Sequence, residues 1–452
     1  MSASVLTWTE ARPIELAVSE RLRRVAASHH GMWNYVTYRD AIGLLGLDPA
    51  EIYPAGTTRL DPKTWADLGW LTCFCGPPAS ALQAMREAVT EESLNQYTPD
   101  LIEPLRDEAA TQFGRARDER FEVVGTEGAQ AGLALALLAS VDPGDEVIVS
   151  DPGYFHIPSA VLAAGGTPVA VAIRSDTGFR LDPDAVAAAI TPRTRAICIV
   201  DPVNPYGTVQ TTAELHALAE LAERHRLLLI HDVTHAPLAL GPGEPFVSLP
   251  ALDVTDKAVA VMSVSHCFGM AGARIGFLGG PPGLVRGCLQ LKAALTRLNT
   301  NLISQHGALA ALRDREYLDS AATTIARNLA HLERTLEDVA GARLVIRPRR
   351  GLACAVDVSG TGTSAQELMV SLFARRVAVY PADGLGDTAA AGTIRLNLSR
   401  PDAWAMDHLR EVLPEAVEEA ASGRWRDPVL ELLRRKGTPR AAAVAEQIQR
   451  RS

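Results

Sequence analysis

Short apolar runs alternate with longer helical stretches through the middle of this chain. The apolar runs are nearly continuous and rich in β-branched residues, and they cover 146–150, 196–200, 227–231 and 258–264. The stretches between them are rich in alanine and leucine. Strands that are apolar throughout and separated by helices are typical of a mainly parallel sheet with helices on both faces. The sequence therefore predicts an α/β fold for residues 71–315.

Beyond residue 315 the pattern changes to one long helical stretch followed by isolated strand-like pieces. We predict a helix over 317–339, strands over 343–346, 352–358 and 393–398, and a helix over 402–421. This succession indicates a smaller α+β lobe over 316–424. Residues 1–70 are predicted to form an N-terminal arm and part of the small lobe. The arginine-rich segment 425–452 is predicted to be an exposed C-terminal appendage.

Composition restricts the possible functions. A chain of 452 residues suits two lobes, and 47% hydrophobic residues suffice for a large core. The formal net charge of −9 argues against a nucleic-acid partner, which requires a basic patch. No apolar run approaches the ~18 residues of a membrane span, the N-terminus lacks a signal pattern, and the six cysteines form no zinc-type pair. We therefore expect a cytoplasmic protein that binds no metal, membrane or nucleic acid.

Two segments at predicted strand ends carry groups that suit a phosphate. Gly125 and Thr126 form a small-residue turn before an apolar helical run, and the start of a helix offers free backbone N–H groups. Ser263 and Arg274 lie on the turn that follows the 258–264 run, where a hydroxyl and a guanidinium fork can bind phosphate oxygens. Each feature alone also occurs in ordinary turns, so the phosphate site is predicted from their combination.

Three more strand ends carry residues that suit a flat ring containing nitrogen. Tyr154 follows the 146–150 run and can stack on such a ring, although a loop aromatic can equally cap the core. Asn204 stands between two prolines after the next run, which aim its amide as a donor to a phenolate oxygen. Asp232 ends a third run and needs a cationic partner, which a protonated pyridine nitrogen would supply; its simpler role is a helix N-cap.

These motifs, in this order, resemble the large domain of fold-type-I pyridoxal-phosphate (PLP) enzymes of the class I/II aminotransferase family. The family pattern has a serine three residues before a lysine and an arginine eight residues after it, and Ser263 and Arg274 keep this register around His266. The resemblance extends from about residue 70 to about residue 420. It implies an aspartate aminotransferase-like fold, with a mainly parallel, seven-stranded-type sheet and a smaller α+β lobe. It also implies PLP or its amine form, pyridoxamine phosphate (PMP), as the cofactor.

The same resemblance implies roles for residues outside these strand ends. Tyr97 lies in a segment similar to the one whose tyrosine reaches the cofactor phosphate of a partner subunit, which implies a homodimer. Arg395 resembles the arginine that binds the substrate α-carboxylate, which implies an amino or keto acid substrate. Gly76 lies where the family has a glycine loop that contacts the substrate.

The chain departs from the family pattern at two positions. His266 stands where the family has its Schiff-base lysine, and His235 replaces a tyrosine three residues after the ring-nitrogen aspartate. The lysines of the chain offer no obvious substitute; they are Lys63, Lys257, Lys292 and Lys436. Histidine cannot form a stable imine, but its pKa of about 6.5 suits proton transfer at neutral pH. We therefore predict a biosynthetic enzyme that binds PLP or PMP noncovalently, with His266 as acid/base and His235 assisting.

Three alternatives remain open. A branch of PMP-dependent sugar dehydratases of the same fold also carries histidine at this position, but the chain resembles them less because Arg395 implies an amino or keto acid. The chain could instead be a catalytically impaired family member or a ligand-binding regulator. It could also use the fold without PLP, although the retained polar cage argues against this. A structural role is expected for five other polar or reactive side chains, namely His231, Tyr206, Cys267, Cys73 and Cys75.

Overall fold

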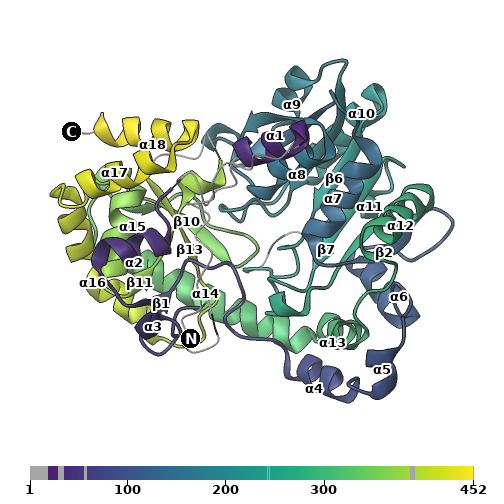
Figure 1. Cartoon of the computed structure of the whole chain (residues 1–452), viewed down its shortest axis with the longest axis horizontal. Helices are drawn as coiled ribbons and strands as arrows, with labels where there is room; N and C mark the ends of the chain where they lie inside the picture. The colour runs from purple at the N-terminus through teal and green to yellow at the C-terminus, as the bar shows by residue number, and fades with distance from the viewer. Residues whose placement is uncertain are drawn as a thin grey trace.

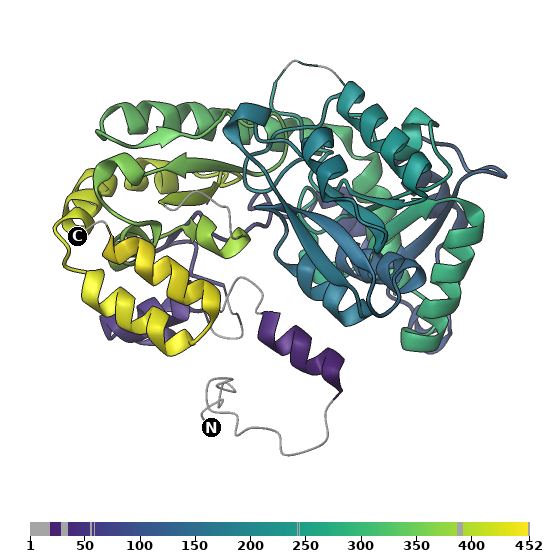
Figure 2. The ribbon, with the colours of Figure 1, turned by 90° about the horizontal axis from the view of Figure 1, so that it is seen from above.

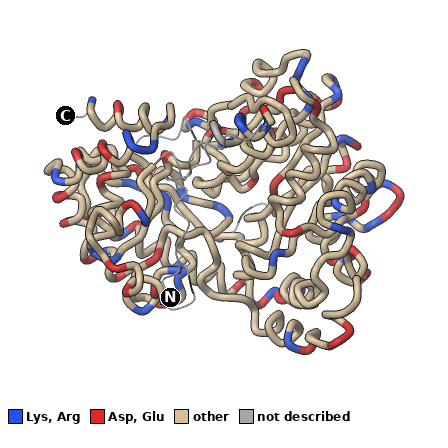
Figure 3. Tube along the Cα trace, viewed as in Figure 1, with Lys and Arg blue, Asp and Glu red and all other residues tan. Residues whose placement is uncertain are grey.

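A large and a small lobe lie side by side, joined by the long helix α14 (Arg315–Glu337) (Figure 1). The structure, a computed structural model, describes residues 19–28, 35–54, 57, 59–241, 243, 245–386 and 392–450. Positive and negative side chains are interspersed along the described trace (Figure 3). Within these residues, no helix has the length and apolar character that a membrane crossing requires.

The large lobe is built on a seven-stranded sheet in the order β2-β8-β7-β6-β5-β3-β4. Neighbouring strands are parallel except where β8 pairs with β2 and β7. The strands are β2 (Glu122–Thr126), β3 (Glu146–Asp151), β4 (Thr167–Ala172), β5 (Thr194–Val200), β6 (Leu228–Asp232), β7 (Ala258–Ser263) and β8 (Gly276–Gly280). The predicted mainly parallel α/β sheet is confirmed, and the four predicted apolar runs correspond to β3, β5, β6 and β7.

Helices cover both faces of this sheet because both faces of its strands are apolar. In β3, Val147 and Val149 belong to one buried cluster, whereas Ile148 belongs to another on the opposite face. Burying a side chain of this kind contributes about 1.5–3 kcal/mol, so each face needs its own helical layer. One layer contains α7 (Ala129–Ser140), α8 (His156–Ala164) and α12 (Pro282–Thr296), and the other contains α9 (Pro183–Ala189) and α10 (Thr212–His225).

The small lobe combines a four-stranded antiparallel sheet, ordered β12-β13-β10-β9, with a parallel pair of β1 and β11. Its strands are β1 (Ala66–Asp67), β9 (Arg343–Leu344), β10 (Ala353–Asp357), β11 (Val377–Ala378), β12 (Tyr380–Pro381) and β13 (Thr393–Asn397). Its helices include α2 (Tyr38–Leu45), α15 (Ala365–Ala374) and α16 (Trp404–Ala421). The pairing of β1 with β11 makes residues 66–67 part of this lobe, whereas α1 (Glu20–Ser28) contacts α8 of the large lobe.

The C-terminal segment is a packed helical hairpin rather than the exposed appendage that its composition suggests. It consists of α17 (Arg426–Lys436) and α18 (Pro439–Gln449), which run side by side (Figure 2). Val429, Leu433 and Ala441 are fully buried. Apolar residues recur at helical spacing in both helices, and this spacing, more than the arginine content, determines how the segment packs.

Candidate active site

Chemically active side chains gather where the carboxyl ends of the large-lobe strands face the small lobe. β5, β6 and β7 are parallel neighbours, so Asn204, Asp232 and His266, which end or follow them, emerge at one edge of the sheet. Arg395 comes from β13 of the small lobe, and its Nη1 lies 3.4 Å from Asn204 Oδ1. The candidate site therefore lies between the lobes.

Asp232 has one occupied and one open carboxylate oxygen. Its Oδ1 accepts hydrogen bonds from the backbone N–H (3.0 Å) and the hydroxyl (2.5 Å) of Thr234. Its Oδ2 has no hydrogen-bond partner among the described residues. Burial raises the pKa of this carboxyl, and the Thr234 hydrogen bonds oppose the rise. A carboxylate in this situation needs a cation or a further donor.

The neighbouring His231 is buried and forms hydrogen bonds within the core. Its Nε2 lies 3.2 Å from Asp201 Oδ2, and its Nδ1 accepts a hydrogen bond from the Leu249 N–H at 3.1 Å. Both ring nitrogens are therefore used, as expected for a structural histidine.

His266 is held so that one ring nitrogen is left for chemistry. Its Nδ1 is hydrogen-bonded to the carbonyl oxygen of Leu71. A carbonyl only accepts, so Nδ1 carries the proton and Nε2 carries the free lone pair. Burial, together with the charges of Arg395 and Arg274, lowers the pKa of His266 to about 4, although the Leu71 hydrogen bond opposes the shift. The neutral ring is therefore a proton acceptor at neutral pH.

His235 lies directly beside His266. The two ring centroids are 4.8 Å apart, with an angle of 31° between the ring planes. Burial, and then the charges of His266 and Arg395, hold the pKa of His235 well below its ordinary value. His235 borders the same small hollow as Leu71 and Asn204. The structure thus places the two histidines side by side.

None of the four lysines of the chain offers its amine to this site. The Lys257 amine pairs with Glu223, and the Lys436 amine lies 2.7 Å from Asp40 Oδ2. Lys63 is exposed and lies between β1 and the preceding helices. Lys292 is buried, and its Nζ donates to Asp100 Oδ1 (2.9 Å), Gly125 O (2.8 Å) and Thr300 Oγ1 (2.7 Å).

The prediction that Gly125 contacts a phosphate is corrected by the structure. Gly125 lies within β2, where its N–H donates to Asp100 and its carbonyl accepts from Lys292. The Thr126 hydroxyl donates to Gly128 O at 2.9 Å, so it supports the turn that follows. Both residues precede the turn instead of forming it.

The start of α7 provides the free donors that were expected of this segment. Gly128 is its N-cap, with a φ of 94°, and the N–H groups of Ala129 and Gln130 have no acceptor among the described residues. A Cβ added to Gly128 would lie 2.7 Å from Arg274 Nη2, so the glycine leaves room for the guanidinium. In the sequence, the signal for this helix start is a glycine directly before an apolar helical run, because glycine readily adopts a positive φ.

Arg274 and Ser263 lie where the sequence predicts them, around the same turn. Arg274 is exposed, and its Nη2 donates to the carbonyl oxygen of Glu127 at 2.7 Å. Ser263 is the buried last residue of β7, and its hydroxyl oxygen accepts from the Ser265 N–H at 3.3 Å. The α7 N-terminus, with these two residues, forms a cradle of donors and positive charge that suits a phosphate.

Tyr154 is joined to the start of α7 by a hydrogen bond. Its hydroxyl donates to Gln130 Oε1 at 2.9 Å. Burial raises the pKa of Tyr154, the charge of Asp232 raises it further, and the charge of Arg274 opposes the rise. An aromatic ring influenced by both charges lies close to both, as a ring that stacks on a phosphorylated heterocycle must.

Arg395 is buried and has an unused donor. Its Nη2 donates to Gly69 O at 2.9 Å, whereas its Nε has no hydrogen-bond partner among the described residues. Burial lowers the pKa of this guanidinium, and nearby tyrosines, Tyr380 first, oppose the effect. A buried cation with an open N–H suits a carboxylate ligand.

Tyrosines around Arg395 form a part of the site that the sequence did not reveal. The guanidinium carbon lies 4.2 Å from the Tyr380 ring centroid, and the Tyr35 ring lies 4.9 Å from that of Tyr380. The Tyr38 hydroxyl donates to Val379 O at 3.2 Å. No local spacing relates these tyrosines to Arg395, since only the folded small lobe brings them together.

The predicted substrate contact of Gly76 does not agree with its hydrogen bonds. The Gly76 carbonyl accepts from the Tyr317 hydroxyl at 2.7 Å, and its N–H donates to Cys73 O at 3.2 Å. The Gly76 N–H is therefore occupied within its own loop, and its carbonyl oxygen already accepts one hydrogen bond. Within the same loop, Leu71 is the residue that reaches the site, through its bond to His266.

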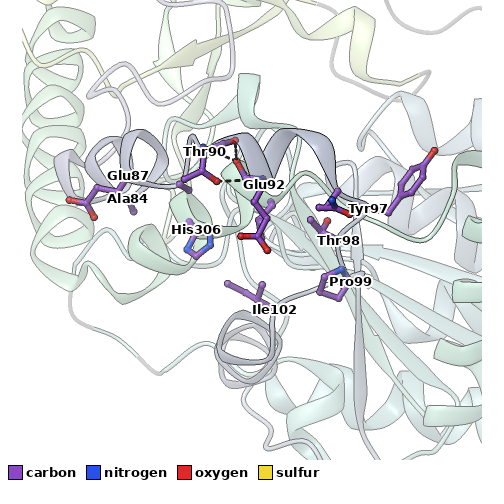
Figure 4. Close-up of a pocket in the computed structure, with 13 residues that line it drawn as sticks. Ala84, Glu87, Thr90, Glu92, Tyr97, Thr98, Pro99, Ile102 and His306 are labelled. Atoms are coloured by element: carbon purple, nitrogen blue, oxygen red, sulfur yellow. Dashed lines mark hydrogen bonds between the residues drawn. The ribbon is translucent and has the colours of Figure 1, made fainter.

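Tyr97 lies on the outside of the molecule. Its side chain is 77% exposed, with the Arg297 guanidinium 4.6 Å from its ring centroid, and it contacts neither His266 nor the α7 turn in any interaction described here. It borders a pocket of about 680 Å³ together with Thr90, Glu92 and His306 (Figure 4). The predicted contact with the cofactor of a partner subunit is neither supported nor contradicted by a single chain.

The residues present fit a pyridoxal-type cofactor. Asp232 has an open oxygen for a protonated ring nitrogen, Tyr154 supplies a stacking face, and the cradle at Gly128 has free donors for a phosphate. Arg395 has an open N–H for a carboxylate. No group of three or more His, Cys, Asp or Glu side chains within the described residues is arranged to hold a metal ion.

Comparison with solved structures identifies the class of fold. An aspartate aminotransferase from Thermus thermophilus matches with a TM-score of 0.74 and 26% identity, covering 90% of this chain and 99% of that protein. N-succinyldiaminopimelate aminotransferase from Mycobacterium tuberculosis matches with a TM-score of 0.75 and 25% identity, covering 88% of this chain and all of that protein. The fold is thus that of the aspartate aminotransferase-like, PLP-dependent enzymes, as predicted.

Sequence comparison identifies the family. The family "Aminotransferase class I and II" matches residues 72–413, and the chain belongs to this family. An arginine–pyruvate transaminase from Pseudomonas aeruginosa is 34% identical over 63% of this chain and 72% of its own length. A probable aspartate/prephenate aminotransferase from Thermus aquaticus is 31% identical over 71% of this chain and 83% of its own length. The chain is therefore an aminotransferase-like enzyme, for which family and fold imply PLP or PMP.

Proposed function

We propose that this chain is an aminotransferase-family enzyme that binds PLP or PMP without a covalent bond and uses His266 as its proton acceptor and donor. The observation that carries the proposal is the His266–Leu71 hydrogen bond, which directs a neutral, unprotonated Nε2 away from that carbonyl. The amines of Lys257, Lys292 and Lys436 are paired with carboxylates, which supports cofactor binding without a covalent bond.

Different residues of the site would bind different parts of the cofactor. When bound, PLP supplies a carbonyl that condenses with an amine and a pyridine ring that accepts electrons. Asp232 would pair with the ring nitrogen, Tyr154 would stack on the ring, and Asn204 would donate to the phenolate oxygen. The start of α7, with Ser263 and Arg274, would bind the phosphate.

His266 would move the proton between the substrate carbon and the cofactor. A base with a free nitrogen beside the reacting atoms typically contributes about 10²–10⁴-fold to the rate. The charges of Arg395 and Arg274 contribute to the low pKa of His266. A carboxylate and a phosphate bound to these arginines would oppose that effect and bring the His266 pKa closer to neutrality. His235 would support the His266 ring by contact.

Arg395 would select substrates that carry a carboxylate next to the reacting carbon. Its buried, open Nε–H favours an amino acid or the corresponding keto acid. The related enzymes are named for arginine, pyruvate, aspartate and prephenate, which all carry such a carboxylate. We propose the same class for this chain, within a biosynthetic reaction.

We also propose a homodimer. Tyr97 and Leu94 are 77% and 69% exposed, and Tyr97 borders the pocket of Figure 4. Exposed aromatic and aliphatic side chains of this kind are typical of subunit interfaces. In the dimer Tyr97 would approach the cofactor of the partner subunit.

The test is the exchange of the substrate Cα proton with deuterium in D₂O, followed by NMR with PLP present. The wild type should catalyse exchange, and His266→Gln should lose about 10²–10⁴-fold while retaining cofactor affinity in equilibrium dialysis. His216→Gln, at an exposed position of α10, is the matched control and should leave exchange unchanged.

Two results would contradict the proposal. Undiminished exchange in His266→Gln would show that another group moves the proton. A wild type that takes up neither PLP nor PMP would instead favour a ligand-binding regulator or chemistry that needs no cofactor.

A further inference from the structure

A short small-lobe segment is fastened to the loop that carries Tyr154. This segment, here called the strap, consists of residues 382–386, and the stacking loop consists of residues 151–154. The Gly153 N–H donates to the carbonyl oxygen of Leu385 at 3.0 Å. A Cβ added to Gly386 would lie 1.8 Å from Asp151 Oδ1 and 2.8 Å from Pro152 Cα. The strap and the stacking loop are therefore in direct contact, and nothing larger than glycine fits at residue 386.

The C-terminal hairpin holds the other side of the strap. Arg440, in the first turn of α18, donates from Nη2 to the carbonyl oxygen of Gly386 at 3.0 Å. Thr438 caps this helix by accepting from the Ala441 N–H at 2.9 Å, which fixes the position of Arg440. On the small lobe, Lys436 lies 2.7 Å from Asp40 of α2. The hairpin is thus anchored on the small lobe and reaches the strap through one charged donor.

These contacts form a continuous path from the C-terminal hairpin to the loop that carries Tyr154. The path runs from Arg440 through Gly386 and Leu385 to Gly153, which directly precedes Tyr154. The family match ends at residue 413, so α17 and α18 lie outside it.

We propose that Arg440 is a positioning residue, and that the C-terminal hairpin acts through the strap to keep the stacking loop against the cofactor. The proposal rests on the proposed function, because it treats Tyr154 as the residue that stacks on the ring. A cofactor without a covalent bond depends entirely on such contacts, so a device that holds the stacking loop has a direct effect on its retention.

Gly386→Ala is the sharpest variant, because it disturbs the strap–loop contact by its bulk alone. The φ of 164° at Gly386 is extended backbone that alanine adopts freely, whereas its Cβ must displace Asp151 or Pro152. Gly43→Ala is the matched control, since Gly43 lies in a small-lobe helix with nothing within 4 Å of the added Cβ.

Arg440→Ala and Arg440→Lys test the contact between the hairpin and the strap. Arg450→Ala is their control, because Arg450 is the C-cap residue of the same helix and its guanidinium pairs with the exposed Glu446. Loss of a hydrogen bond from a charged donor lowers the equilibrium constant of the contact that it stabilises by about tenfold or more. Arg440→Lys keeps the charge at residue 440 and should partly restore the contact with the strap that Arg440→Ala removes.

Hydrogen–deuterium exchange of the full-length protein without cofactor reports the Gly153 N–H directly, and PLP dissociation constants report the consequence. In Gly386→Ala and Arg440→Ala we expect faster exchange over residues 150–154 and about tenfold weaker PLP binding. Arg440→Lys should recover part of both properties, and the two control variants should change neither. Unchanged exchange at Gly153 in both variants would overturn it, as would faster exchange with unaltered PLP affinity. Failure of the wild type to bind PLP would contradict the proposed function, while the exchange result would still decide whether the hairpin holds the loop.

Discussion

Asp232→Asn separates the stability of the protein from its affinity for the cofactor. Asparagine has the same shape, and its Oδ1 can accept both hydrogen bonds from Thr234. The change replaces only the open oxygen by an NH₂ group and removes the charge. Because Oδ2 has no partner and burial raises the pKa of this carboxyl, the charge is a cost to the protein without cofactor.

The two effects therefore have opposite signs. A hydrogen bond to a charged group contributes about 1.5–3 kcal/mol, so loss of the pairing with a protonated ring nitrogen should weaken PLP binding by about 10- to 150-fold. Without cofactor, the variant should unfold at the same or a higher denaturant concentration than the wild type. Fluorescence titration with PLP and urea unfolding measure the two quantities. Equal affinity for PLP, or a less stable apo protein, would refute the assignment of Asp232 to the ring nitrogen.

Three further predictions concern other parts of the site. Arg395→Gln should raise KM for the amino acid by about 10- to 100-fold in steady-state assays, with unchanged PLP affinity, because it removes a charged hydrogen bond to the carboxylate; a normal KM would contradict this. Burial lowers the pKa of His266 to about 4, so in the protein without cofactor the His266 ring should stay neutral as pH falls through 6.5, and an NMR titration of this ring should show protonation only towards that lower value; an inflection at 6.5 in this titration would count against it. Lys292→Met should cost more in urea unfolding than Lys257→Met, because it removes the buried cation 2.9 Å from Asp100 and leaves only the more distant Arg106 at 3.6 Å, whereas the more exposed Lys257 pair should contribute about 0–1 kcal/mol; similar costs would contradict the role of the buried pair.

The parts of the site that lie at strand ends could be predicted from sequence, because there the local pattern and the geometry coincide. A buried apolar strand must end at the edge of the sheet, so Asp232 and Asn204 could be assigned to one edge without knowing the fold in detail. The register of Ser263, His266 and Arg274 is a local spacing, and the structure keeps all three around one turn.

Contacts between distant segments could not be predicted in this way. The ion pair of Lys292 with Asp100 joins residues 192 positions apart, and both side chains bond to the backbone of Gly125. The tyrosines around Arg395 come from separate segments of the small lobe, and no spacing relates them. The charge content of the C-terminal hairpin indicates exposure, but the helical spacing of its apolar residues determines that it packs on the small lobe.

The central claim is that the cofactor is held without a covalent bond beside His266. The most direct measurement is the intact mass of the PLP-loaded wild type and His266→Lys after borohydride reduction and denaturation. The account predicts that the wild type keeps its unmodified mass and releases its cofactor on dialysis, whereas His266→Lys gains the mass of one reduced cofactor. A covalent adduct on any lysine of the wild type would contradict it.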